Sequence, residues 1–359
     1  MSSEVLIDFR MHRNSGIGRF ITNLVGKLHS RGKNLRLLAS SKDISSLTLS
    51  YPNAKISIFD TALFTLKEQL GHTAYRQPAI IHAPHFNHPI LARRPDVLTI
   101  YDMFAFQYPG FFRNKRIAGL KILLPILLKR TKLVHCISKY TADCLVHYYP
   151  SVSPQIRIIH LGIESRFQPT ESRPDSIDKP YFLYVGNLSP HKNLPALIEA
   201  LALFSQSGCQ YRLVIIGKSF KGQMQLLEEL IRSRGLSEQV MILSGLNDQR
   251  LLEFYSHATA LIHPSLSEGF GFTPLEAMAC GTPALISRAG SLPEVCGDAA
   301  LYFDPLKPEE IAARMKQIVL EKNLRQEMIE RGKARAKEFT WEKCVDGIIE
   351  LYKEAASKK

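Results

Sequence analysis

Short apolar segments recur along the whole chain, and they constrain its fold more than any other feature. Most are continuously apolar rather than alternating, as expected for strands buried on both faces of a parallel sheet, and longer helical patterns separate them. Each half is therefore predicted to be a doubly wound α/β domain. The predicted strands span 5–9, 35–39, 79–82, 97–101, 133–137 and 156–160 in the first half, and 181–185, 212–216, 240–243, 260–263, 284–287 and 300–303 in the second.

A stretch rich in proline separates the two halves. Residues 164–180 hold three prolines among charged and hydroxyl side chains, which is typical of a linker. At 359 residues the chain also exceeds what one hydrophobic core usually serves. We expect an N-terminal domain at 1–165, a linker at 166–180, a second domain at 181–338, and a C-terminal helix at 339–359 that packs back toward the first domain.

The charge balance bears on the partners of the chain. It has 46 Lys and Arg residues against 33 Asp and Glu, a net charge of +13, which favours an anionic partner such as nucleic acid, anionic lipid or a phosphorylated substrate. The six cysteines are scattered, with no C-x-x-C pair, as expected of reduced thiols in the cytosol. No signal peptide pattern and no apolar run of ~20 residues is present. We therefore expect a cytoplasmic protein that is not integral to a membrane.

Much of the positive charge gathers at 113–132, which holds seven basic residues and no acidic one around an aliphatic centre. Two interpretations stay open. The segment is either a basic amphipathic surface for an anionic membrane, which would make the protein peripheral on the inner face of the cytoplasmic membrane, or a core helix with solvated basic ends. Pro125 is expected to kink or restart the helix. Nucleic acid is disfavoured as a partner, because the basic residues flank aliphatic rather than aromatic side chains.

Two glutamates, Glu268 and Glu276, mark the turn after the predicted strand 260–263. The intervening loop is rich in glycine and leads into a helix predicted to begin at Thr273. Such turns at the carboxyl ends of parallel strands bind ligands in open α/β sheets, and helix N-termini attract phosphate. Glu268 precedes the helix and is predicted to bind a ligand. Glu276 is either a ligand as well or, with Thr273 as N-cap, the acidic member of a capping box.

Phosphate candidates follow other strands. Gly16 and Gly18 lie in a predicted loop after the first strand, where they either approach a phosphate or merely make a tight turn. The dinucleotide fingerprint G-x-G-x-x-G fails at Ile21, which argues against a nicotinamide-dependent dehydrogenase. In the second half, Lys192 and Lys218 each follow a strand, and the two strands are expected to be adjacent. Together they favour an anionic ligand.

These motifs carry a resemblance. The segments 16–19 (Gly-Ile-Gly-Arg), 186–193 (Gly-Asn-Leu-Ser-Pro-His-Lys-Asn), 217–218 (Gly-Lys), 268–276 (Glu-Gly-Phe-Gly-Phe-Thr-Pro-Leu-Glu) and 291–295 (Ser-Leu-Pro-Glu-Val) resemble those of family 4 glycosyltransferases. The resemblance extends over nearly the whole chain and is strongest to bacterial mannosyltransferases that build cell-surface polysaccharide. It implies the GT-B fold, two Rossmann-like α/β domains that face each other across a cleft.

The resemblance also implies roles for individual residues. Glu268 would bind hydroxyls of the donor sugar, Glu276 the ribose, and Lys192 the diphosphate. The remaining donor contacts would come from Gly16, Gly18, Asn187, Lys218 and the backbone of Gly269, Phe270, Gly271 and Phe272. The donor would be a nucleoside-diphosphate sugar, with GDP-mannose favoured and a UDP-sugar as the alternative, and the acceptor a glycan or a lipid-linked glycan.

The chain departs from the family pattern at two places. Many relatives have an arginine in the turn that carries Lys192, where this chain has Asn187 and His191, and Lys218 is the candidate to compensate. Relatives also carry a His-Asp pair after the fourth strand, where this chain has Tyr101 and Asp102. We therefore count Tyr101 and Asp102 with Glu268 and Lys192 as catalytic candidates.

The expected chemistry uses neither metal nor cofactor. The Asp-x-Asp pattern that holds a metal in many glycosyltransferases of another fold occurs nowhere in this sequence, so lysine side chains and helix-terminal amides are expected to stabilise the departing diphosphate. The family retains the anomeric configuration, and we favour front-face displacement. Two other functions stay open: a sugar-nucleotide epimerase of the same fold, and a non-catalytic sugar-nucleotide-binding subunit of a polysaccharide assembly complex.

Overall fold

The computed structural model describes residues 4–76, 78–111, 114–206, 208–219 and 222–358, and within 114–118 it describes the backbone only. The chain forms two compact units. The first contains the residues up to Gly162 together with those from Thr340 onward, and the second contains Ile163–Phe339. The chain thus leaves the first unit three residues before the predicted boundary at 165, and its C-terminal helix belongs to the first unit.

The first unit is built on a seven-stranded parallel sheet in the order β3-β2-β1-β4-β5-β6-β7. Five of its strands are continuously buried or nearly so, and each lies within a residue of the predicted bounds or inside them. The strands are β1 (Val5–Asp8), β2 (Leu35–Ala39), β3 (Lys55–Ile58), β4 (Ile80–Ala83), β5 (Val97–Ile100), β6 (Leu133–Cys136) and β7 (Ile156–Ile158). The sequence prediction missed β3, because this short edge strand is partly exposed along its whole length and therefore lacks an apolar run.

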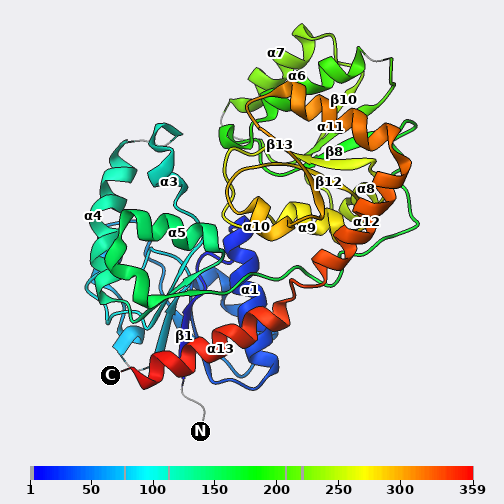
Figure 1. The fold of residues 1–359 in the computed structure, drawn as a ribbon. Coiled ribbons are helices and arrows are strands. Elements are labelled where there is room, and N and C mark those ends of the chain that lie inside the picture. The colour runs from blue at the N-terminus through cyan, green and yellow to red at the C-terminus, as the bar shows by residue number, and fades with distance from the viewer. Residues whose placement is uncertain (1–3, 77, 112–113, 207, 220–221, 359) are drawn as a thin grey trace. The chain divides into compact units, whose positions relative to one another are not determined.

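Helices cover this sheet. They are α1 (Ser15–Ser30), α2 (Ile44–Ser50), α3 (Phe104–Gln107), α4 (Asn114–Arg130), α5 (Lys139–Tyr148) and, from the end of the chain, α13 (Trp341–Ser357). Helix α13 packs against α1 and against strands β4 and β5 (Figure 1). Its Tyr352 hydroxyl lies 2.7 Å from Nδ1 of His82, a buried histidine of β4. This polar contact inside the unit fixes the C-terminal helix on the sheet.

Helix α4 contains most of the basic segment 113–132. Leu124, Leu127 and Leu128 are buried in the core of the first unit, whereas Ile122 and Ile126 are 64% and 40% exposed. The helix therefore has one face in the core, as the core-helix interpretation expects, and an apolar strip on its outer face. Arg113 lies outside the described residues. Among the helices that the structure describes, none has the length and apolar character needed to cross a lipid bilayer.

The second unit is built on a six-stranded parallel sheet in the order β10-β9-β8-β11-β12-β13. All six strands have the predicted bounds, because each is apolar except at one end position in β9, β11 and β12. They are β8 (Tyr181–Val185), β9 (Arg212–Ile216), β10 (Val240–Leu243), β11 (Ala260–His263), β12 (Ala284–Ser287) and β13 (Ala300–Phe303). The helices are α6 (Leu194–Ser205), α7 (Gln223–Ser233), α8 (Asp248–His257), α9 (Phe272–Ala279), α10 (Leu292–Cys296), α11 (Pro308–Leu320) and α12 (Lys322–Ala336).

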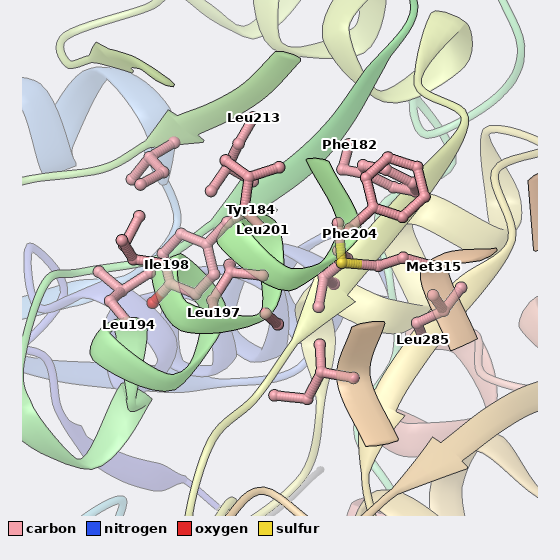
Figure 2. Close-up of a cluster of buried hydrophobic side chains, with 14 of the residues drawn as sticks. Phe182, Tyr184, Leu194, Leu197, Ile198, Leu201, Phe204, Leu213, Leu285 and Met315 are labelled. Atoms are coloured by element: carbon pink, nitrogen blue, oxygen red, sulfur yellow. The ribbon is translucent and has the colours of Figure 1, made fainter. Parts of the chain in front are cut away.

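The main core of this unit lies between α6, α11 and the sheet (Figure 2). Helix α6 presents apolar side chains at i, i+3, i+4 and i+7, which is the spacing of one helix face. They meet side chains of the strands and of α11. The labelled members of this cluster are Leu194, Leu197, Ile198, Leu201 and Phe204 of α6, Phe182, Tyr184, Leu213 and Leu285 of the sheet, and Met315 of α11. Because α6 is fixed in this way, the turn that precedes it is fixed too.

Candidate functional site

The turn between β11 and α9 carries Glu268, and contacts with Gly290 and Ser291 hold the backbone of this turn in place. The amide and the hydroxyl of Ser291 each donate a hydrogen bond of 3.0 Å to the Glu268 carbonyl, and the hydroxyl also donates to the Phe270 carbonyl at 2.7 Å. Gly290 lies directly against Glu268, since a Cβ at position 290 would stand 2.5 Å from both the amide nitrogen and the carbonyl oxygen of Glu268. The Glu268 turn is therefore a rigid support rather than a loose loop.

This contact makes Gly290→Ala a sharp test of the support. Gly290 has φ of +63°, so alanine would be strained by its backbone conformation and would also collide with Glu268. Positive φ alone costs about 1–2 kcal/mol, and the collision raises the expected loss of unfolding free energy to about 3 kcal/mol or more. Urea unfolding measures it. The matched control is Gly235→Ala, with φ of +68° and nothing within 4 Å of the added Cβ; equal losses in both variants would contradict the close contact.

The Glu268 side chain is paired with two nitrogen groups. Its Oε1 accepts a hydrogen bond of 2.5 Å from Nζ of Lys192 and lies 2.7 Å from Nε2 of His263. Burial by itself opposes ionisation of the carboxyl, but Lys192 and His263 overcome it and hold the pKa of Glu268 well below its usual range. The structure thus brings together Glu268 and Lys192, two of the predicted site residues, as an ion pair in the second unit.

His263 is a site residue that sequence reasoning missed. It is the last residue of β11, and its ring stacks on that of Tyr184 with centroids 6.3 Å apart. Its Nε2 faces Glu268 and also lies 3.1 Å from the hydroxyl of Ser265, while its Nδ1 has no hydrogen-bond partner in the part of the chain that the structure describes. The only sequence signal was its position at a strand end, five residues before the glutamate.

The turn that carries Lys192 has less positive charge than it would have with an arginine at position 187 or 191. Burial and the neighbouring Lys192 lower the pKa of His191 to about 4, so this imidazole is neutral at neutral pH. The carbonyl of His191 accepts a hydrogen bond of 2.8 Å from the amide of Leu266, which joins this turn to the Glu268 turn. His191 therefore contributes to the geometry of the site and adds no positive charge to it.

Asn187 and Lys218 belong to adjacent turns. Gly217 packs so closely on Gly186 that a Cβ at position 217 would stand 1.7 Å from the Gly186 carbonyl oxygen, and the amide of Leu188 donates to the Lys218 carbonyl at 3.1 Å. The Lys218 side chain is exposed. Asn187 supports its own turn, because its Oδ1 accepts a hydrogen bond of 2.7 Å from Ser189. The structure thus places Lys218 beside the turn of Lys192, as the predicted adjacency of β8 and β9 requires.

The capping-box interpretation of Glu276 is wrong. Helix α9 begins at Phe272, with Gly271 as its N-cap at φ of +118°, so Thr273 lies inside the first turn. Because glycine can adopt this positive φ, the helix begins before Thr273 rather than at it. The Glu276 carboxylate instead accepts a hydrogen bond of 2.7 Å from the hydroxyl of Tyr255, and its side chain is buried.

The predicted loop from Gly269 to Phe272 is partly core. Phe270 is buried, and its ring contacts those of Phe272 and Phe339. Donor contacts of this loop through its backbone, and a ribose contact of Glu276, stay predictions.

The remaining predicted residues lie in the first unit. Gly16 and Gly18 are not in a loop, because α1 already begins at Ser15; glycine is a weak helix former, so its low propensity hid the helix start. Gly18 is required by packing, since a Cβ there would stand 2.1 Å from the carbonyl oxygen of His12. The tight-turn interpretation is therefore wrong. Gly18 lies in the first turn of α1, where it lets the helix approach the backbone of His12 closely.

Tyr101 and Asp102 follow β5 in the first unit. Burial raises the pKa of Tyr101 well above its usual range, and its hydroxyl has no hydrogen-bond partner among the described residues. Asp102 is exposed, and its Oδ1 accepts a hydrogen bond of 3.0 Å from the amide of Phe104 at the start of α3. The structure thus gives Asp102 a local structural role and buries the Tyr101 hydroxyl. A catalytic role for either stays a prediction.

Comparisons with known proteins cover both units. The family model described as Glycosyltransferase Family 4 matches residues 14–167, and that described as Glycosyl transferases group 1 matches residues 168–335. An O-antigen chain mannosyltransferase B from Escherichia coli is 30% identical over 284 residues, which cover 76% of this chain and 74% of that protein. The O-antigen chain mannosyltransferase RfbU from Salmonella typhimurium is 31% identical over 233 residues, which cover 65% of this chain and 63% of that protein.

Solved structures share the fold. A glycosyltransferase from Rickettsia africae superimposes with a TM-score of 0.78 at 16% identity, over 100% of both chains. The Anabaena protein HepE, in complex with UDP and glucose, superimposes with a TM-score of 0.79 at 18% identity, over 98% of this chain and 100% of that one. Together with the two parallel sheets, these similarities confirm the predicted GT-B fold.

Proposed function

The chain belongs to glycosyltransferase family 4, and on that premise we propose that it transfers mannose from GDP-mannose to a glycan or lipid-linked acceptor. The observation that carries the proposal is the pair of Glu268 and Lys192, held 2.5 Å apart at the carboxyl ends of β11 and β8. An ionised carboxylate suits sugar hydroxyls, and an ammonium group suits a diphosphate. The O-antigen mannosyltransferases among its relatives support mannose, and HepE with its UDP supports a UDP-sugar as the alternative.

The pair also suggests how the donor is activated. In the absence of donor, Lys192 neutralises Glu268. We propose that the diphosphate takes over Lys192, while Glu268 keeps its hydrogen bond to His263 and turns its freed acceptor positions to the sugar. Lys218 in the adjacent turn and the amides at the N-terminus of α9 would share the negative charge that develops on the departing phosphate. The proposed reaction needs no metal and retains the anomeric configuration by front-face displacement.

The proposal places the protein in the cytoplasm, at the inner face of the membrane, where a lipid-linked acceptor would be presented. Support comes from the outer face of α4, where Ile122 and Ile126 are exposed between the exposed basic residues Lys121 and Lys129. A strip of apolar and basic side chains suits the headgroup region of an anionic membrane.

A donor screen tests the proposal. Incubation with GDP-mannose is expected to raise the melting temperature, because a ligand that binds only the folded state at 100 times its Kd adds about 2.7 kcal/mol of stability. Release of GDP from the bound donor is expected as well, and Lys192→Met should abolish both effects. UDP-glucose is the comparison donor. If neither donor raises the melting temperature and neither nucleoside diphosphate is released, the proposed function is wrong.

One observation favours a second candidate function. His191 is neutral and Asn187 is engaged in its own turn, so the site has fewer positive charges for the diphosphate than one with an arginine. A non-catalytic sugar-nucleotide-binding subunit would tolerate this. Donor binding in the melting assay without any release of nucleoside diphosphate, even with acceptor glycan present, would favour that candidate.

A further inference from the structure

In one loop of the first unit, large apolar side chains are exposed and a carboxylate is buried. The segment 64–70 follows β3, and its apolar residues point to solvent: Phe64, Leu66 and Leu70 are 58%, 91% and 70% exposed. Glu68, in the middle of the same segment, is 0% exposed. Single exposed apolar side chains are common on protein surfaces, but an arrangement with the carboxylate inside and three large apolar side chains outside marks a surface that contacts something other than water.

Buried polar contacts hold the loop in this orientation. The Oε1 of Glu68 accepts a hydrogen bond of 2.7 Å from the Arg10 guanidinium, which also pairs with Asp8 at 2.6 Å. The Oε2 of Glu68 accepts a hydrogen bond of 2.5 Å from the amide of Phe64. The side chain of Arg10 is only 4% exposed. Turning the leucines inward would therefore break a buried ion pair, which is strongly unfavourable when one charge is left without its partner.

A second segment extends the same surface. The carbonyl of Gln69 accepts a hydrogen bond of 3.2 Å from the amide of Leu91, and its Oε1 accepts one of 3.0 Å from the amide of Ile90. Leu91 is 70% exposed. The backbone contact places Leu91 beside Leu70, so that four large apolar side chains belong to one surface, which we call the apolar tip: Phe64, Leu66, Leu70 and Leu91.

The charge around the apolar tip identifies the kind of partner. Residues 61–95 contain four basic side chains, at Lys67, Arg76, Arg93 and Arg94, and a single acidic one, Glu68, which is buried. All four basic residues are exposed. Arg93, however, pairs with the buried carboxylate of Asp96 at 3.3 Å, so the charge available to a partner lies on Lys67, Arg76 and Arg94. A protein partner that matched the apolar residues alone would not need this one-sided charge, whereas the interface of an anionic bilayer takes apolar side chains below the headgroups and basic ones among them.

We propose that the apolar tip inserts into the headgroup region of an anionic lipid bilayer, with Lys67 and Arg94 among the phosphates. The inference rests on the proposed function and deepens it, because it assigns the membrane contact of a lipid-linked acceptor to a surface that sequence reasoning did not identify. The apolar tip is more strongly exposed than the strip on α4 and is the principal membrane contact.

Flotation with vesicles tests the inference. The wild-type protein is expected to float with vesicles of phosphatidylcholine and phosphatidylglycerol, and less with phosphatidylcholine alone. The double variant Leu66→Glu, Leu70→Glu should reduce the bound fraction about tenfold, because two apolar contacts are lost and two negative charges are added. The matched control is Leu49→Glu, which changes a leucine that is 85% exposed on α2 and should float like the wild type.

The outcomes separate the surface from the function. Undiminished flotation of the double variant, or a loss seen only in the α4 variant Ile122→Glu, Ile126→Glu, would overturn the assignment. So would a wild-type dimer in sedimentation that the double variant converts to a monomer, since the tip would then bind a second copy. Release of nucleoside diphosphate without vesicles should be unchanged in the double variant. For the wild-type protein, release without flotation defeats this inference alone, and flotation without release defeats the proposed function alone.

Discussion

Glu268→Gln should lower kcat/KM for sugar transfer by about 10²–10³-fold, since mutations that remove one preorganised electrostatic contact typically have effects of that size. Glutamine has the shape of glutamate and keeps one acceptor, but it loses the negative charge that Lys192 and His263 stabilise. Without that charge, hydroxyls of the donor sugar lose a charged acceptor, and the Lys192 ammonium group loses its partner in the absence of donor. Steady-state kinetics with purified protein measure the effect, and a melting curve shows whether the variant is folded.

A buried carboxylate elsewhere in the same unit provides the control. Glu253 on α8 is 5% exposed, and it accepts hydrogen bonds from Arg250 and from the hydroxyl of Ser172. Glu253→Gln should cost stability to a similar extent and leave kcat/KM near that of the wild type. If both variants lose activity in proportion to their loss of stability, the effect of Glu268→Gln is one of folding. Wild-type kinetics in a folded Glu268→Gln variant would remove Glu268 from the site.

The sequence predicted the strands well where burial leaves a clear pattern. Strands β8 to β13 are apolar except at one end position in β9, β11 and β12, and their bounds were predicted to the residue. Strand β3 lies at the edge of its sheet, and Lys55 and Ser57 interrupt the apolar pattern. An edge strand needs only partial burial, so its residue types do not distinguish it from a loop.

The candidate site was less predictable, because its contacts depend on backbone conformation. The motif predicted that Glu268 and Lys192 belong to one site, and the structure pairs them. The helix start at Phe272 depends on the positive φ of Gly271. From the sequence alone, Thr273 followed by Pro274 is an equally good helix start. His263 was invisible because a histidine at a strand end is usually structural, and only the folded turn brings it to Glu268.

The loop 64–70 shows a further limit of sequence patterns. The loop contains both apolar and polar residues, and the usual expectation is that its leucines are buried and its charged residues are exposed. The buried partner of Glu68 is Arg10, which lies 58 positions away in the sequence. No local pattern contains that contact, so the side of the loop that faces solvent could be seen only in the structure.

Acidification is expected to destabilise the first unit before most carboxylates titrate. Burial lowers the pKa of His135 to about 4 and, with His135 nearby, lowers that of His82 well below its usual range. Both rings are used as neutral groups: His82 lies between Tyr352 of α13 and Thr99 of β5, and Nε2 of His135 lies 2.8 Å from the carbonyl oxygen of Ile159. In the unfolded chain each histidine would titrate near about 6.5.

The sign of the effect follows from proton binding. Below pH of about 6.5 the unfolded chain binds protons that the folded unit refuses, so stability is complete above that pH and falls as the pH is lowered toward 4. Each histidine contributes up to about 1.4 kcal/mol per pH unit, and the two together remove about 3 kcal/mol between pH 6.5 and 5. That is a substantial part of the roughly 5–15 kcal/mol typical of a folded protein. Urea unfolding at pH 7 and at pH 5 measures it.

Two variants separate these buried rings from the rest of the protein. His135→Asn cannot take up a proton, so the pH dependence between 6.5 and 5 should weaken by up to about 1.4 kcal/mol per pH unit. His147→Gln, at an exposed position on α5, should leave it unchanged. A pH dependence that His135→Asn does not alter would mean that other groups govern acid unfolding. If the dependence weakens as expected, the buried neutral ring of His135 helps to set the lower pH limit at which the first unit stays folded.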